Sequence, residues 1–134
     1  MKLFFILYGA SVLFTLNLVF QDTALEESMA RGKDVYADFC VSCHLDTGEG
    51  ILGSFPPLAN SDYLRENRKA SIAGVKYGQK GELVVNGVTY NNTMAPMGLS
   101  DAEIADVMNY IMHSWGNTAD KMVTEKEVNT ILKE

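Results

Sequence analysis

The sequence predicts an all-α domain that includes one short β-hairpin. Residues 23–39, 61–77 and 100–115 carry apolar side chains at the three- and four-residue spacing of amphipathic helices. Residues 81–90 instead contain two short apolar runs on either side of Asn86-Gly87, which is the pattern of a hairpin with a type I′ turn. The 134 residues are enough for one such domain, and no internal repeat divides the chain.

The first 20 residues form a segment of their own. Lys2 precedes a mostly apolar run that reaches Phe20, as in a secretory signal peptide. The run is about 18 residues long, the lower limit for a membrane span, and no small-x-small cleavage site precedes Gln21. Residues 1–20 are therefore predicted to be a signal peptide or an uncleaved N-terminal membrane anchor. Both place the domain in the periplasm or another extracytoplasmic compartment.

Residues 23–39 are expected to form the first helix. Its apolar stripe consists of Leu25, Met29, Gly32, Tyr36 and Phe39. Glycine within a helix costs about 1 kcal/mol relative to alanine. The sequence leaves open whether Gly32 lets another helix approach closely or is simply tolerated.

The helix leads into Cys40-Val41-Ser42-Cys43-His44, the attachment signature of a c-type haem. On one helical turn Cys40, Cys43 and His44 share a face. We therefore expect both thiols to form thioether bonds to one haem c and His44 to ligate its iron. Rival readings fit less well: a disulfide would close a very short loop, zinc needs about four ligands, and a thioredoxin-type pair needs a βαβ setting.

Residues 45–60 lack a helical period and contain three glycines and two prolines. This composition predicts a loop over the haem edge. A backbone carbonyl at Pro56 or Pro57 is expected to accept a hydrogen bond from the second ring nitrogen of His44, which would fix the tautomer of the ligand. The sequence does not choose between the two prolines.

Residues 61–77 are predicted to form one helix with Ser61 as its N-cap. This region holds a group of basic side chains, namely Arg65, Arg68, Lys69, Lys76 and Lys80. A solvated helix face is the favoured interpretation, and a docking edge is the alternative.

The whole chain is acidic, with a formal net charge of −6. This charge argues against nucleic-acid binding, which would require a basic stripe. It suits a carrier that docks on a positively charged redox partner, and equally a charge that only keeps the protein soluble.

Residues 100–115 are expected to form the last large helix, with Ser100 and Glu103 as a capping box and Gly116 as its end. Its apolar stripe consists of Ile104, Val107, Met108, Ile111 and Trp115. The tail, residues 118–134, contains a further capped helix that starts near Thr124 and either packs on the body or frays.

A methionine is expected as the second axial ligand, because a thioether is a soft ligand and His/Met ligation raises the haem potential. Of seven methionines, only Met94 and Met97 lie in an irregular segment before the last large helix. Met94 is favoured over Met97, and an open iron site is the remaining alternative. His113 is expected on the surface, opposite the apolar stripe of its helix.

Between about residues 25 and 116 the chain resembles the class I cytochromes c. The resemblance rests on the helix leading into the Cys-x-x-Cys-His motif, on the loop Phe55-Pro56-Pro57-Leu58, and on the segment from Gly87 to Met97 with Leu99-Ser100-Asp101 and Trp115-Gly116-Asn117 after it. The last part looks like a bacterial subgroup that also occurs fused to copper nitrite reductases or alongside membrane dehydrogenases.

The resemblance implies a cytochrome c-like fold around the haem. Residues 21–117 would form the cytochrome c domain. The methionine followed by x-Pro is the axial ligand in the subgroup and matches Met94, although Ala95 stands where those proteins often have proline. In the family the N- and C-terminal helices cross near a glycine and an aromatic residue, and Gly32, Tyr36 and Tyr110 match these positions. The family's proline that orients the histidine ligand matches Pro56 better than Pro57.

The sequence therefore predicts a one-electron carrier rather than an enzyme, with His44 and Met94 as iron ligands. The expected partners are redox proteins such as a reductase, an oxidase or a dehydrogenase. The alternative is a cytochrome subunit that permanently feeds such a complex. A haem-based gas sensor with an open iron site is a further rival, against which Met94 counts.

Overall fold

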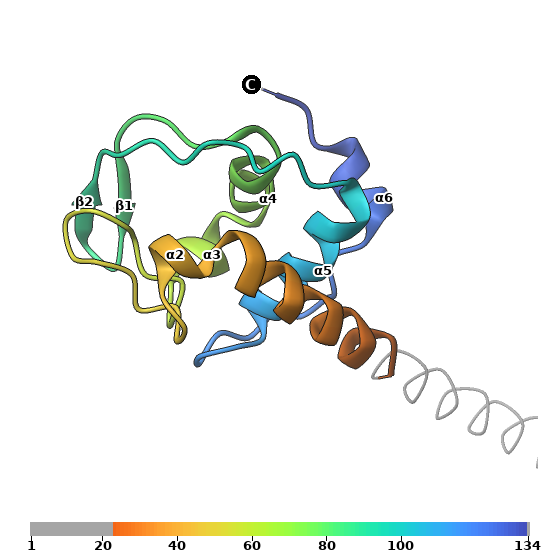
Figure 1. The fold of residues 1–134 in the computed structure, drawn as a ribbon. Helices are drawn as coiled ribbons and strands as arrows, with labels where there is room; N and C mark the ends of the chain where they lie inside the picture. The colour runs from red at the N-terminus through yellow and green to blue at the C-terminus, as the bar shows by residue number, and fades with distance from the viewer. Residues whose placement is uncertain (1–22, 134) are drawn as a thin grey trace, which may run out of the picture.

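The computed structural model describes residues 23–133, of which residues 23–39 are helical. The other elements, in chain order, are α2 (Val41–His44), α3 (Asp62–Glu66), α4 (Arg68–Tyr77), β1 (Leu83–Val85), β2 (Val88–Tyr90), α5 (Asp101–Met112) and α6 (Glu125–Thr130) (Figure 1). The predicted signal or anchor in residues 1–20 lies outside the described residues. Within residues 23–133, no helix has both the length and the apolarity needed to cross a membrane.

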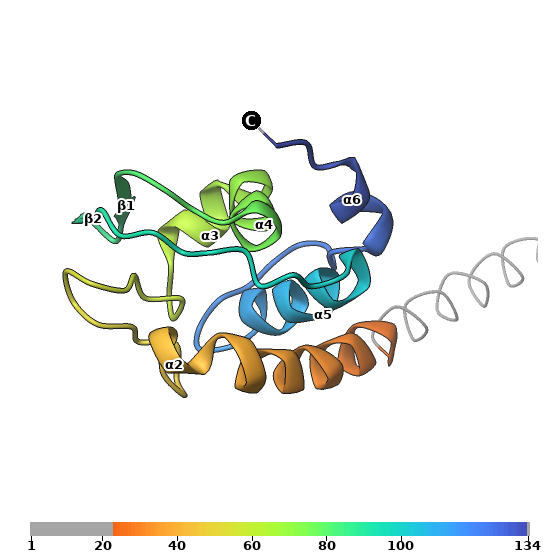
Figure 2. The same cartoon turned by 45° about the horizontal axis from the view of Figure 1, so that its top comes forward.

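The helix of residues 23–39 packs against α5 (Figure 2). Gly32 lies directly against the α5 backbone. A Cβ atom on Gly32 would overlap the carbonyl oxygen of Asp106 and lie 2.9 Å from the amide nitrogen of Val107. The side chain of Asp106 also accepts hydrogen bonds from Ser28 and Arg31 on the facing helix. Gly32 is therefore the close-approach glycine, which resolves the alternative that the sequence left open.

Three aromatic rings join the two crossing helices to the turn after α5. The centroids of Tyr36, Tyr110 and Trp115 lie 5.0–5.6 Å apart in tilted and edge-to-face arrangements. Such geometries are favourable beyond the area they bury. The Tyr36 hydroxyl donates a hydrogen bond of 2.7 Å to the carbonyl of Leu45. The cluster thus positions the end of α2, which carries His44.

The prediction of one helix over residues 61–77 is wrong at Asn67. The chain leaves helical geometry there, with φ −124° and ψ 47°, and continues as a second helix, α4. Asparagine favours such breaks because its short polar side chain competes with the helical backbone. The predicted N-cap is confirmed: the Leu64 amide donates to the Ser61 hydroxyl at 3.3 Å.

The predicted hairpin is confirmed. Leu83 pairs with Tyr90 and Val85 with Val88, and both turn residues have positive φ, 51° at Asn86 and 76° at Gly87. This is the geometry that a type I′ turn requires. The turn is attached to α3 by two hydrogen bonds between Asn86 and Asp62, of 2.7 and 3.0 Å. An isolated two-stranded hairpin is marginal in water, so these contacts stabilise it.

The capping box at the start of α5 is present as predicted, formed by Ser100 and Glu103. The helix ends at Met112, three residues before the predicted boundary. Trp115 and Gly116 then adopt positive φ values of 52° and 84°. This turn directs the chain back across the molecule.

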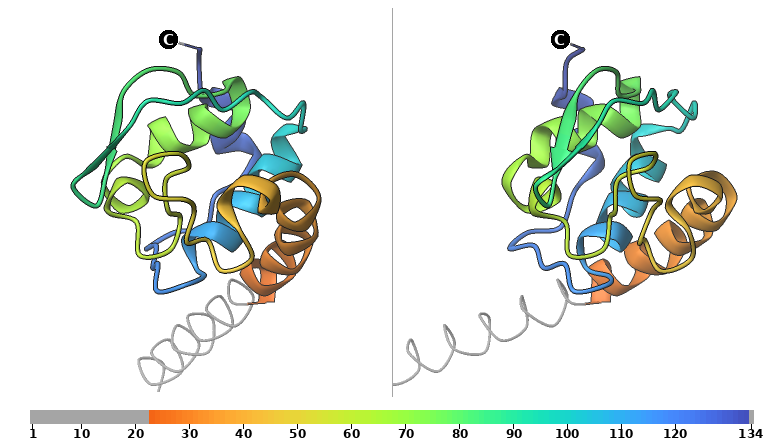
Figure 3. Two further views of the ribbon diagram at one scale, coloured as in Figure 1. Left: turned by 60° about the vertical axis from the view of Figure 1, so that its left-hand side comes forward. Right: turned by 90° about the vertical axis from the view of Figure 1, so that its left-hand side faces the viewer.

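The C-terminal segment, defined here as residues 117–133, packs against α4 and α5 (Figure 3). Val123, Val128 and Ile131 are buried in the common core. The fully buried Asn109 of α5 exchanges two hydrogen bonds with the backbone of Val123, of 2.6 and 2.8 Å. Of the two outcomes that the sequence left open for the tail, packing is the one observed.

Candidate haem site

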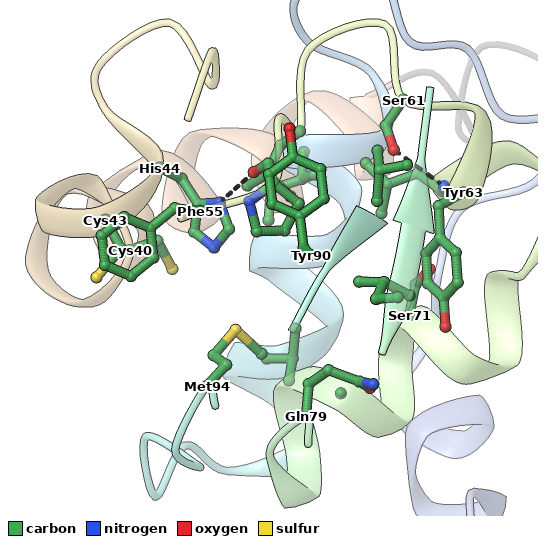
Figure 4. Close-up of a pocket in the computed structure, with 18 of the residues that line it drawn as sticks. Cys40, Cys43, His44, Phe55, Ser61, Tyr63, Ser71, Gln79, Tyr90 and Met94 are labelled. Carbon is green, nitrogen blue, oxygen red and sulfur yellow. Dashed lines mark hydrogen bonds between the residues drawn. The ribbon is translucent and has the colours of Figure 1, made fainter. Parts of the chain in front are cut away.

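A cavity of about 230 Å³ lies between α2, the loop of residues 45–60, α4, the hairpin and the segment of residues 91–99 (Figure 4). A single water needs only about 10–15 Å³ by the same measure. The cavity is therefore large enough for an organic ligand. Its walls are mainly apolar, with contributions that include Phe55, Leu58, Leu64, Val75, Leu83, Val85, Tyr90, Leu99 and Ile111.

Cys40, Cys43 and His44 all line this cavity, as their spacing on one helical turn predicts. Both cysteines are free thiols in this structure. Burial, with a smaller contribution from Cys43, raises the pKa of the Cys40 thiol to about 11. Within residues 23–133, no group of three His, Cys, Asp or Glu side chains is placed to hold a metal ion, as a zinc site would require.

The His44 ring is buried and oriented by one hydrogen bond. Its Nδ1 lies 3.0 Å from the carbonyl oxygen of Pro56. A carbonyl only accepts, so Nδ1 carries the proton and Nε2 is left with a free lone pair. Burial lowers the pKa of His44, against a smaller opposing effect of the Pro56 hydrogen bond, so the neutral form is favoured. The structure thus selects Pro56 over Pro57.

Met94 reaches the same cavity from the segment that follows β2 (Figure 4). Its backbone is paired with Gln79, each amide donating to the other carbonyl at 2.8 and 2.9 Å. Met97 also lines the cavity but is 37% exposed, whereas Met94 is half-buried. His113 is not among the lining residues, and its Nδ1 donates to the Asn109 carbonyl at 2.9 Å.

The sequence did not predict that α4 forms one wall of the cavity. Ala70, Ser71, Gly74 and Val75 face the cavity from this helix. A Cβ atom on Gly74 would come within 4.0 Å of the Met94 methyl group. The small residues along one face of α4 were the available signal. Val85 and Tyr90 of the hairpin also line the cavity.

The apolar cavity, the two thiols of Cys40 and Cys43 on its wall, and the His44 imidazole oriented by Pro56 together fit a covalently bound haem. Residues 29–115 match the cytochrome c family. The chain belongs to the cytochrome c family. Its members carry electrons on a haem c that is bound through cysteine side chains, and Cys40 and Cys43 have the required spacing.

The chain is similar to a cytochrome c-552 and to cytochrome c subunits of two dehydrogenases. Cytochrome c-552 of Thermus thermophilus is 39% identical over 95 residues, which are 67% of this chain and 64% of that protein. The cytochrome c subunit of the quinone alcohol dehydrogenase of Gluconobacter oxydans is 29% identical over 123 residues, 83% of this chain and 24% of the subunit. The cytochrome c subunit of gluconate 2-dehydrogenase of Pantoea cypripedii is 30% identical, with 28% of its length covered.

Proposed function

We propose that this cytochrome c is a one-electron carrier whose haem iron has His44 and Met94 as axial ligands, and that it performs no bond-making chemistry of its own. The observation that carries the proposal is the cavity that holds Cys40, Cys43, His44 and Met94 together. A bound haem c supplies the Fe(III)/Fe(II) couple. The residues of the chain bind it, orient it and exclude water from it.

Each of the four residues has a distinct role in this proposal. Cys40 and Cys43 form the thioether bonds. His44 ligates through Nε2, and its tautomer is set by the Pro56 carbonyl at 3.0 Å. Met94 supplies a thioether sulfur, which favours the reduced state and raises the potential. With His44 and Met94 both holding the iron, small molecules would have no free site on it.

The domain works outside the cytoplasm in this proposal. The basic and apolar pattern of residues 1–20 supports export. Its physiological partners are redox proteins that contact the cytochrome transiently. The net charge of −6 favours partners with a positively charged docking face.

Replacement of the proposed ligand tests the function directly. Met94→Ala should lower the reduction potential by on the order of a hundred millivolts, a fraction of the about 0.8 V that axial ligands span. The ferrous variant should also bind carbon monoxide, whereas the ferrous wild-type protein should not. Potentiometric titration with optical spectra measures both effects, and Met97→Ala is the matched control. An unchanged potential in Met94→Ala and a lowered one in Met97→Ala would assign the ligand to Met97.

A second candidate is supported by the similarity to dehydrogenase subunits: a cytochrome that stays bound to one enzyme complex and passes its electrons on. The haem chemistry is the same, but the partner is permanent. Purification from native membranes discriminates between the two. Co-elution with a dehydrogenase through several columns supports the subunit, whereas isolation of the cytochrome alone supports the free carrier.

A further inference from the structure

The C-terminal segment is attached to α4 by side chains at both ends of that helix. At the first turn, Arg68 forms two hydrogen bonds of 2.7 Å with Glu127. Its guanidinium also donates to the carbonyls of Lys121 and Met122 at 3.0 and 3.1 Å. Arg68 was interpreted from sequence as part of a solvated face, and that interpretation is wrong, because its charge is used to bind the C-terminal segment.

The last turn of α4 makes a second attachment. Lys76 donates to the carbonyl of Val128 at 2.8 Å and forms an ion pair of 2.9 Å with Asp101, the first residue of α5. The hydroxyl of Tyr77 donates to the carbonyl of Ile131 at 2.8 Å. Lys76 is therefore not a solvated residue either. These bonds fix the end of α4 against two other elements.

The residues that follow at once, Gly78 and Gln79, hold the backbone of Met94. Gln79 and Met94 exchange two hydrogen bonds of 2.8 and 2.9 Å. Gly78 has φ +84°, and a Cβ atom there would lie 2.7 Å from the Met94 carbonyl oxygen and 2.9 Å from Pro96. Gly78 is the single residue between Tyr77, which bonds the C-terminal segment, and Gln79, which bonds the Met94 backbone. The position of Met94 is thereby coupled to the C-terminal segment.

We propose that Lys76 and Tyr77 are positioning residues for the methionine side of the haem site: they hold the end of α4 against the C-terminal segment and so keep the Gln79–Met94 pair, and the Met94 sulfur with it, in the cavity. The inference rests on the proposed role of Met94 as an axial ligand. It assigns to a segment outside the Cys-x-x-Cys-His motif a part in retaining the second ligand.

The test uses the full-length holoprotein with the double substitution Lys76→Leu and Tyr77→Phe. Two measurements are made: amide hydrogen exchange at Gln79 and Met94, and loss of the Met-to-iron charge-transfer band with urea. One hydrogen bond contributes roughly a fivefold factor to an equilibrium. The double variant should therefore speed exchange at the two amides on the order of tenfold relative to the α5 amides. Its charge-transfer band should disappear at a urea concentration below that of helix unfolding.

Arg68→Leu is the matched control, since it removes contacts with the same segment at the opposite end of α4. It should lower the urea midpoint of global unfolding while the Gln79 and Met94 amides remain protected relative to α5. If exchange at the Gln79 and Met94 amides were accelerated equally in both variants, the effect would come from general destabilisation of the C-terminal segment. That result would overturn the proposal. Unchanged exchange in the double variant would overturn it as well.

The two measurements separate this inference from the proposed function. If the ferric wild-type protein lacks the charge-transfer band, Met94 is not a ligand and the proposed function fails, whatever the exchange rates are. If the band is present and disappears in Met94→Ala, but neither exchange nor band stability responds to the double substitution, the ligand assignment stands and the positioning role is wrong.

Discussion

At the scale of single residues, Gly32 allows the close helix crossing and one hydrogen bond orients His44 in the haem site. Gly32 lacks the methyl group that would separate the first helix from α5. His44 is held in one tautomer by one carbonyl, that of Pro56. For Gly32 the sequence did not show which backbone atoms it would contact, and for His44 it narrowed the partner to the carbonyl of Pro56 or Pro57.

Gly32→Ala should destabilise the protein even though alanine is the better helix former. Overpacking typically costs about 1–3 kcal/mol, whereas the gain in helix propensity is about 1 kcal/mol. The new Cβ atom overlaps the Asp106 carbonyl, so we expect the upper part of that range and a net loss of about 1–2 kcal/mol. Urea denaturation followed by circular dichroism measures it.

The exposed position Ala37 in the same helix supplies the control. Ala37→Gly should cost about 1 kcal/mol and thus gives the propensity scale of this helix. If Gly32→Ala proved more stable than the wild type by the same amount, no steric limit would exist at the crossing.

At the scale of elements, the fold depends on how the C-terminal segment closes over α5. Asn109 is fully buried at this contact and bonds Ser28 of the first helix as well as the backbone of Val123. One side chain thus joins three elements. The apolar stripe predicted for α5 accounts for only one of its buried faces, because Ala105, Asn109 and Met112 are buried too.

Asn109→Ala should therefore destabilise the protein by about 2–4 kcal/mol, because it leaves the buried amide and carbonyl of Val123 without partners. Thermal and urea unfolding measure the change. Asn129→Ala is the matched control, since Asn129 is exposed and makes one bond of 3.1 Å, to Asp101. Its effect should stay within about 0.5 kcal/mol. Equal effects of the two substitutions would mean that burial of Asn109 contributes nothing.

The turn signals and caps show how much of the element structure is local. The hairpin, the Ser61 cap and the Ser100–Glu103 capping box were predicted correctly, since each depends on residues within a few positions. The break at Asn67 was missed. Apolar residues continue at helical spacing across it, and a single asparagine costs a helix only about 0.7 kcal/mol or less, so the sequence does not by itself predict that the helix ends there.

At the scale of the whole molecule, charge pairs attach the C-terminal segment to the cytochrome body. Arg68 lowers the pKa of Glu127, and Lys76 lowers that of Asp101. A carboxyl group whose pKa is lower in the folded state stabilises the fold above its unfolded pKa. That contribution is lost as the pH falls through the folded pKa.

Acid should consequently weaken the attachment of the C-terminal segment. As the pH falls below the ordinary glutamate value of 4.5, the wild type should lose stability more steeply than Glu127→Gln, which has no proton to take up at this position. Urea midpoints measured across this pH range give the comparison. The partial exposure of the pair limits the difference to a small one. Parallel pH profiles for the two proteins would show that the ion pair is not linked to folding.

The sequence by itself determined the haem motif, the hairpin turn and the helix caps, because each is a pattern of neighbouring residues whose chemistry is local. Only the tertiary structure decided that Pro56 rather than Pro57 orients His44, that Gln79 pairs with the Met94 backbone, and that Arg68 binds Glu127. These contacts join residues far apart in the chain. Their geometry depends on how the helices pack and on where the chain reverses, which no local pattern specifies.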